Sequence, residues 1–179
     1  IAVAVGIVVA GGVLVACGGG GNSGAGLEQP AAVSAAQFTD ANGVVTRYEY
    51  DLLNRLAAVV ENLDAGGPAD HQTNVRTEYT YDENGNRLTI RDGNGHVTTF
   101  TYDGINRLST EADALGNTTS YAYDVVGNRT ALTDANGFST NFTYDAANRL
   151  IGIDYPAPDA DVSFTYDPVG NRVSMADGS

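Results

Sequence analysis

Short segments of alternating hydrophobic and polar residues fill most of the chain. In residues 98–102 the sequence runs Thr-Thr-Phe-Thr-Tyr, so Phe100 and Tyr102 share one side of an extended segment. Alternation with a period of two, in β-branched and aromatic residues, is typical of β-strands. A second alternating segment, with Leu88 and Ile90 on one side, follows the same rule. The pattern predicts a succession of short strands rather than helices.

The dipeptide Tyr-Asp recurs at regular intervals along these segments. Successive tyrosines are separated by 31, 21, 21, 21 and 22 residues, and an aromatic residue lies two positions before each of them. Internal repetition of this kind indicates a repeat architecture, in which each unit packs on its neighbours. The six copies are Tyr50-Asp51, Tyr81-Asp82, Tyr102-Asp103, Tyr123-Asp124, Tyr144-Asp145 and Tyr166-Asp167.

An asparagine–arginine pair follows each Tyr-Asp dipeptide. The distance from tyrosine to arginine alternates between 5 and 6 residues, because the even-numbered copies carry an extra glycine before the asparagine. We expect two alternating turn types, with the glycine taking the positive φ that tight hairpin loops require. The six arginines are Arg55, Arg87, Arg107, Arg129, Arg149 and Arg172.

A second turn signal, Asp-x-x-Gly, occurs at residues 40–43, 92–95, 113–116 and 134–137. With one turn after Tyr-Asp and another at Asp-x-x-Gly, each repeat comprises two strands. The predicted fold class is therefore all-β, an antiparallel β-meander of YD repeats over residues 38–179.

The repeated residues have expected roles in such a sheet. Tyrosine and the aromatic residue two positions earlier lie on one face, and we expect them to form an aromatic ladder across the strands. Aspartate and arginine are expected to meet across the hairpin and to fix the strand register, through ion pairs or through hydrogen bonds to turn amides. A carbohydrate-binding surface built from the same aromatic and acidic side chains is the functional alternative.

The beginning of the chain has a different composition. Residues 1–16 are apolar or glycine without a charge, which is typical of the apolar region of a signal peptide. The four residues ending at Cys17 resemble a bacterial lipobox, so we expect lipidation of Cys17 and a signal segment over residues 1–17. A glycine- and alanine-rich tether over residues 18–37 follows. A chance cysteine and an internal membrane span are the alternatives.

Charge narrows the range of partners. The chain carries 22 acidic residues against 9 basic ones, for a formal net charge of -13, and all nine basic residues are arginines. Binding to phosphate backbones needs a basic patch, so nucleic acid is disfavoured as a partner.

Candidate chemistry is sparse. His71 and His96 have no cysteine partner and no second histidine at ligand spacing. The turns at residues 92–95 and 134–137 contain oxygen ligands suited to calcium, but each offers too few of them. We expect no catalytic residue, no metal site and no cofactor, and hence no enzyme activity.

The repeat resembles that of the RHS/YD-repeat proteins, which include bacterial cell-surface and polymorphic-toxin proteins. The resemblance rests on Tyr-Asp-x-x-Gly-Asn-Arg-Leu followed by Asp-x-x-Gly, and it covers residues 38–179. It implies a β-strip that curves into a hollow shell, often around a C-terminal toxin or effector domain. Six repeats are too few to close such a shell, so an open, curved partial shell is expected here.

The resemblance also implies a function. It implies a non-catalytic scaffold or shell of a secreted or cell-envelope protein, whose partner is an effector domain. The expected membrane contact is the lipid anchor at Cys17. A carbohydrate-binding module and the repeat part of a toxin are the alternatives. Two departures from the repeat are expected to be a surface loop at residues 62–75 and a strand-ending segment at residues 155–159.

Overall fold

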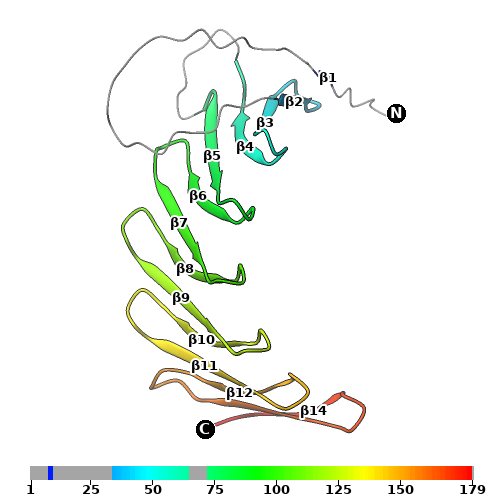
Figure 1. Ribbon diagram of the computed structural model, residues 1–179, viewed down its shortest axis with the longest axis vertical. Helices are drawn as coiled ribbons and strands as arrows, with labels where there is room; N and C mark the ends of the chain where they lie inside the picture. The colour runs from blue at the N-terminus through cyan, green and yellow to red at the C-terminus, as the bar shows by residue number, and fades with distance from the viewer. Residues whose placement is uncertain (1–7, 10–33, 65–71, 179) are drawn as a thin grey trace. The chain divides into compact units, whose positions relative to one another are not determined.

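The computed structural model describes residues 8–9, 34–64 and 72–178, and the regular structure in these residues consists of β-strands. The chain divides into two compact units, Ile1–Thr98 and Thr99–Ser179. In each unit the strands pair antiparallel in sequence order, which confirms the predicted all-β meander (Figure 1).

The first unit contains the two repeats with the longest spacing. Its strands are β1 (Val8–Val9), β2 (Ser34–Thr39), β3 (Val45–Tyr50), β4 (Leu56–Glu61), β5 (Val75–Tyr81) and β6 (Arg87–Arg91). Each of these strands pairs with the next in an antiparallel ladder. Strand β2 begins at Ser34 and ends at Thr39, so it spans the expected boundary at residue 38.

The second unit contains four repeats. Its strands are β7 (Val97–Tyr102), in which the boundary between the units falls, β8 (Leu108–Ala112), β9 (Thr118–Tyr123), β10 (Arg129–Thr133), β11 (Ser139–Tyr144), β12 (Leu150–Asp154), β13 (Val162–Tyr166) and β14 (Arg172–Asp177). Every residue of strand β14 is exposed, and the strand pairs with β13.

Strand register follows from the alternation of side chains. The aromatic residue before Tyr-Asp lies opposite an apolar residue of its hairpin partner in five of the six copies, as Tyr121 lies opposite Leu132, whereas Phe100 lies opposite Glu111. The register shifts by one residue beside each Tyr-Asp turn, for example where Thr143 pairs with Gly152 and Tyr144 pairs with Leu150. Each tyrosine lies opposite the residue five positions after its aspartate, in the register that the turn sets.

A single layer of sheet leaves little to bury. Among the described residues, the buried apolar side chains are Ala57, Ala58, Val60 and Phe100, and no large side chain is fully enclosed. Burial of apolar area is normally the main stabilising contribution. Here local hydrogen bonds and cross-strand pairs therefore carry more of the stability than in a layered domain.

The two expected irregular segments lie between strands. Hydrogen bonds join the two ends of the first segment, residues 62–75. The amide of Asn74 donates to the carbonyl of Asn62 at 3.1 Å, and the side chain of Asn74 pairs with the backbone of Asp64. Residues 65–71 lie outside the described part of the chain. Strand β12 ends at Asp154, immediately before the proline segment, as predicted.

The expected signal segment and tether fall almost wholly outside the described residues. Cys17 is one of the residues that the structure does not describe, and its lipidation stays a prediction. In the parts of the chain that the structure describes, no helix combines the length and apolar character needed to cross a bilayer.

Candidate functional site

One hairpin turn recurs ten times in the described residues. In each turn the aspartate N–H donates to the carbonyl four residues later, and the N–H three residues later donates back to the aspartate carbonyl, at distances from 2.9 to 3.3 Å. The turns begin at Asp40, Asp51, Asp82, Asp92, Asp103, Asp113, Asp124, Asp134, Asp145 and Asp167. Below, positions in a turn are counted from its aspartate, so that the residue after it is position +1.

Position +3 has a positive φ in every one of these turns. Glycine holds it in the even-numbered Tyr-Asp copies, with φ of 101° at Gly127, and asparagine holds it in the odd-numbered copies, with φ of 65° at Asn106. Both residues tolerate the left-handed region better than others do. The prediction of two alternating turn types is therefore wrong: one three-residue loop serves all copies.

The turn aspartate accepts two backbone hydrogen bonds on one carboxylate oxygen. Asp103 Oδ1 accepts from the amides of Ile105 and Arg107, both at 3.0 Å. The Asp-x-x-Gly turns do the same, as Asp113 Oδ1 accepts from Leu115 and Asn117, both at 2.9 Å. The carboxylate thereby closes its own loop.

The second carboxylate oxygen binds the side chain at position +4. In odd-numbered copies this residue is arginine, and Arg107 Nε donates to Asp103 Oδ2 at 2.7 Å. In even-numbered copies it is asparagine, and Asn128 Nδ2 donates to Asp124 Oδ2 at 2.8 Å. The odd-copy ion pairs join Arg55, Arg107 and Arg149 to Asp51, Asp103 and Asp145, and the even-copy amides are Asn86, Asn128 and Asn171.

The sequence pattern suggested that the six arginines are equivalent. The structure shows that they are not. The odd-copy arginines stand at position +4, and the even-copy ones, Arg87, Arg129 and Arg172, stand at position +5. Position +5 lies opposite the repeat tyrosine, so that Tyr50, Tyr102 and Tyr144 face leucine and Tyr81, Tyr123 and Tyr166 face arginine. An alignment of the copies on their aspartates, instead of on their arginines, would have separated the arginines at position +4 from those at position +5.

These contacts shift the titration of the carboxylates. The pKa of Asp103 is lowered by the amide of Arg107 and then by its guanidinium, and the pKa of Asp82 is lowered chiefly by the side chain of Asn86. Burial by itself would raise the pKa of Asp51, but the amide and guanidinium of Arg55 outweigh it and lower that pKa. Hydrogen bonds to the ionised form favour it.

Odd-copy arginines also reach the next repeat. Arg107 Nη1 donates to the carbonyl of Asp124 at 2.8 Å, and its guanidinium lies 4.6 Å from the ring centroid of Tyr123. Arg55 makes the same two contacts with Asp82 and Tyr81 in the first unit. Arg149 repeats them with Asp167 and Tyr166. Each such arginine joins two hairpins through a cation–π contact and a charge-assisted hydrogen bond.

The expected aromatic ladder is interrupted by arginine. Arg129 lies 5.0 Å from the ring centroid of Phe142 and 6.0 Å from that of Tyr121, so a cation separates the aromatic residues of adjacent repeats. Arg172 lies 5.6 Å from Phe164. A strand with aliphatic residues lies between successive strands with aromatic residues. A guanidinium that reaches between strands therefore occupies the space between the rings.

The hydroxyl groups of several repeat tyrosines donate hydrogen bonds to the preceding hairpin. The hydroxyl of Tyr81 donates to the carbonyl of Leu56 at 2.8 Å, and that of Tyr166 donates to Leu150 at the same distance. The hydroxyl of Tyr144 donates to the carbonyl of Arg129 at 3.0 Å. Burial raises the pKa of Tyr81, which remains a donor at neutral pH.

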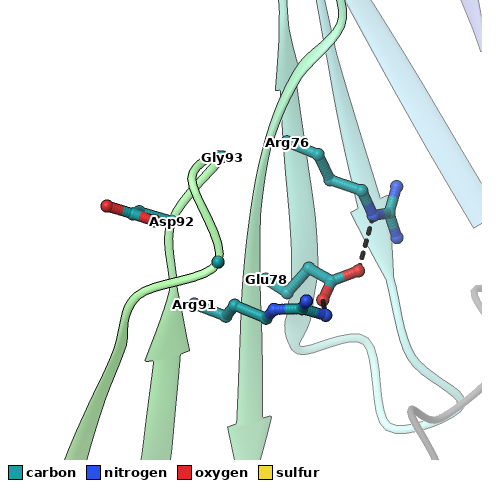
Figure 2. A pocket seen from close by; sticks show the side chains of 6 residues that line it. Arg76, Glu78, Arg91, Asp92 and Gly93 are labelled. Atoms are coloured by element: carbon teal, nitrogen blue, oxygen red, sulfur yellow. Dashed lines mark hydrogen bonds and ion pairs between the residues drawn. The ribbon is translucent and has the colours of Figure 1, made fainter. Parts of the chain in front are cut away.

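The first unit carries an ion-pair network that the sequence pattern did not reveal. The buried Glu49 pairs with Arg47 and, at 2.9 Å, with Arg76. Glu78 pairs with Arg76 at 2.8 Å and with Arg91 at 3.5 Å. Figure 2 shows the Glu78 carboxylate between the two guanidinium groups, beside a shallow hollow of about 140 Å³. The two acids each bind two of the three arginines and link strands β3, β5 and β6, so the network is a cross-strand brace.

Little in the described residues suggests reaction chemistry. His96 Nδ1 lies 3.1 Å from Asp92 Oδ2, which places this histidine at position +4 of its turn, where arginine or asparagine stands elsewhere. No group of three potential metal ligands occurs in the described part of the chain. The oxygens of Asp92 that were considered for calcium accept hydrogen bonds from their own turn. His71 lies outside the described residues.

Solved structures with a similar fold include TcdB2-TccC3 assemblies and a Tc holotoxin pore. The chain matches a crystal structure of TcdB2-TccC3-TEV with 24% identity and a TM-score of 0.63, over 79% of this chain and 8% of that one. It matches the Tc holotoxin pore of Photorhabdus luminescens with 20% identity and a TM-score of 0.63, over the same shares. The chain thus spans about a twelfth of the length of these proteins, and the likeness concerns the fold.

The sequence comparisons identify the family. A search among curated protein sequences finds no match. The family model described as RHS Repeat matches residues 35–67, 81–118, 102–139 and 123–160, which together make up more than half of the chain. These segments coincide with the Tyr-Asp turns and the strands around them. The chain therefore belongs to the RHS repeat family.

Proposed function

We propose that this chain is a non-catalytic structural module of a secreted or cell-surface RHS protein, and that it serves as scaffold or shell wall for a partner or effector domain. The observation that carries the proposal is the use of the repeated side chains. Aspartate, asparagine, arginine and tyrosine of the repeat bind their own or the neighbouring hairpin. Side chains engaged in this way hold neighbouring hairpins together, as expected of a structural repeat.

The class of partner is inferred from the similar structures. Their titles name a Tc holotoxin and TcdB2-TccC3 assemblies. Their shared fold makes a toxin-type effector domain the first candidate for what this module contains or carries. A carbohydrate ligand is the rival, and it would require a surface on which the repeat aromatics are accessible to a sugar.

The natural polypeptide that contains this chain offers the direct test. It would be isolated from its source, treated briefly with protease and analysed by mass spectrometry. The expected result is a resistant fragment that includes residues 34–178 and that is recovered together with a second polypeptide or domain. A resistant strip recovered alone would contradict the scaffold role. Saturable, sugar-specific binding of the 179-residue chain on a glycan array would favour the rival.

We further propose that a lipid on Cys17 anchors the module at the outer side of a bacterial membrane. Support comes from the residues that precede Cys17 and from the glycine-rich stretch that follows it. Mass spectrometry of the mature protein should find residues 1–16 removed and a lipid on Cys17, and Cys17→Ser should abolish both. An intact, unmodified apolar N-terminus would contradict the anchor.

A further inference from the structure

Strand β14 is open on one side in the described part of the sheet. It pairs with β13, and it stands last in the strand order. All six of its residues are exposed, with Val173 at 62% and Met175 at 60% (Figure 1). Edge strands are often protected by proline or by charged side chains along the strand. Strand β14 has charged residues only at its two ends, Arg172 and Asp177, so its backbone is open to a further strand.

Strand β10 shows what a strand at this position of the repeat binds. Both strands begin with the arginine at position +5 of an even-numbered copy, which is Arg129 in β10 and Arg172 in β14. Strand β11, which belongs to an odd-numbered copy, covers the outer side of β10. The residues of β10 that follow Arg129 are half-buried, whereas the same positions of β14 are exposed. The same strand of the repeat is therefore covered in one place and open in the other.

Three contacts join β10 and its turn to the odd-numbered copy that follows. The Arg129 guanidinium lies 5.0 Å from the ring centroid of Phe142, and the Arg129 carbonyl accepts from the hydroxyl of Tyr144 at 3.0 Å. In the turn, Asn128 Nδ2 donates to Asn148 Oδ1 at 3.0 Å. Asn148 stands at position +3, where even-numbered copies have glycine, so of the two kinds of copy only the odd one supplies this acceptor.

The sixth copy carries the same groups on the open side of β14. Arg172 lies 5.6 Å from the ring centroid of Phe164 in its own hairpin, and within the described residues it contacts no second ring. Asn171 Nδ2 donates to Asp167 Oδ2 at 2.9 Å and has a second hydrogen to donate. The edge therefore presents a cation, an amide donor and a carbonyl acceptor, as β10 and its turn do toward β11.

We propose that the outer side of β14 is a docking surface for an extended segment of the odd-copy type, supplied by a second polypeptide. The segment has the pattern aromatic-x-Tyr-Asp-x-x-Asn, and it adds to the sheet as an antiparallel strand. Its aromatic ring stacks on Arg172, its tyrosine hydroxyl donates to the Arg172 carbonyl, and its asparagine accepts from Asn171. This inference goes beyond the scaffold role, because it concerns the strand that the sheet edge binds rather than the contents of a shell.

A peptide taken from this chain provides the probe. Residues 138–154 contain the hairpin of β11 and β12, which is the odd-numbered copy that covers β10. The fluorescently labelled peptide would be titrated with the full 179-residue chain and followed by anisotropy. We expect saturable binding with a Kd between about 10 μM and about 1 mM, since one added strand makes a small interface. Hydrogen exchange should slow in residues 172–177, the whole of β14.

Matched changes in the peptide test the proposed contacts. Phe142→Ala removes the ring that stacks on arginine and should weaken binding about tenfold. Phe138→Ala is its control, because Phe138 lies outside β11, and it should change binding little. Asn148→Gly keeps a residue suited to the positive φ at position +3 but removes the acceptor, so it should weaken binding about fivefold. In the chain, Arg172→Gln should weaken binding as much as Phe142→Ala does in the peptide.

Several results would overturn the proposal. They are the lack of saturable binding below about 1 mM, unchanged exchange in β14, and equal effects of Phe142→Ala and Phe138→Ala. Unchanged binding to the Arg172→Gln chain would overturn it as well. Binding that is unaffected by Asn148→Gly would overturn the preference for odd-numbered copies.

Discussion

The guanidinium of Arg107 lies 4.6 Å from the ring centroid of Tyr123, in the next repeat, while its Nε holds Asp103 of its own repeat. One side chain thus closes a turn and joins that turn to the following hairpin. The same arrangement at Arg55 and Arg149 shows that it belongs to the odd-numbered copies. In a sheet with so little buried area, contacts of this kind have a large share in holding neighbouring hairpins together.

Replacing Arg107 with lysine should destabilise the chain although the charge is kept. Lysine cannot bind Asp103 and the Asp124 carbonyl at once, nor stack its charge flat on Tyr123. We expect a loss of about 1–2 kcal/mol in the free energy of unfolding, measured by urea titration. Arg91→Lys is the control, because Arg91 is 58% exposed and its ion pair is longer, at 3.5 Å. Equal effects of both changes would refute the bridging role.

The positive φ at position +3 should make this position sensitive to alanine. Gly127 has a φ of 101°, so Gly127→Ala should cost about 1–2 kcal/mol, and Asn106→Ala somewhat less. Gly104 is the control: its φ is not in the left-handed region and a Cβ there meets nothing within 4 Å. Gly104→Ala should be neutral or stabilise by about 0.5 kcal/mol. Thermal unfolding of the three variants would check the ranking.

Replacing the side chain of Glu49 should lower the free energy of unfolding. This side chain is 9% exposed and pairs with two arginines, so Glu49→Gln removes the acid that pairs with Arg47 and one of the two acids that pair with Arg76. We expect a loss of about 2–3 kcal/mol in the free energy of unfolding. Glu83→Gln, at an exposed turn tip, is the matched control and should change little. If Glu49→Gln were as mild as the control, the network would contribute nothing measurable.

Acid should unfold the chain through its turn aspartates. The pKa is lowered in the folded state for Asp51, Asp82, Asp92, Asp103, Asp113, Asp124, Asp145 and Asp167. A lowered carboxyl pKa contributes stability that is present above the unfolded-state pKa of about 3.9 and is lost as the pH falls through the folded-state pKa. The urea midpoint should therefore be level near neutral pH and drop steeply below about pH 4. A midpoint that is unchanged down to pH 3 would argue against these carboxylates as the source.

The sequence by itself determined the strands, the turns and the order in which they pair. Period-two alternation and a repeat of Tyr-Asp and Asp-x-x-Gly are local signals, and each hairpin is made of residues close in the chain. The antiparallel meander therefore followed without any long-range information. The family followed from the same residues, because the repeat is the unit that the family model matches.

Only the tertiary structure decided which arginines are equivalent and what each one touches. Counting from tyrosine to arginine suggested two loops of different length, but the hydrogen bonds show one loop with asparagine or glycine at position +3. The contact of Arg107 with Tyr123, and of Glu49 with Arg76, joins residues of different strands. Such pairs depend on register and on side-chain reach across the sheet, which no local pattern of residues specifies.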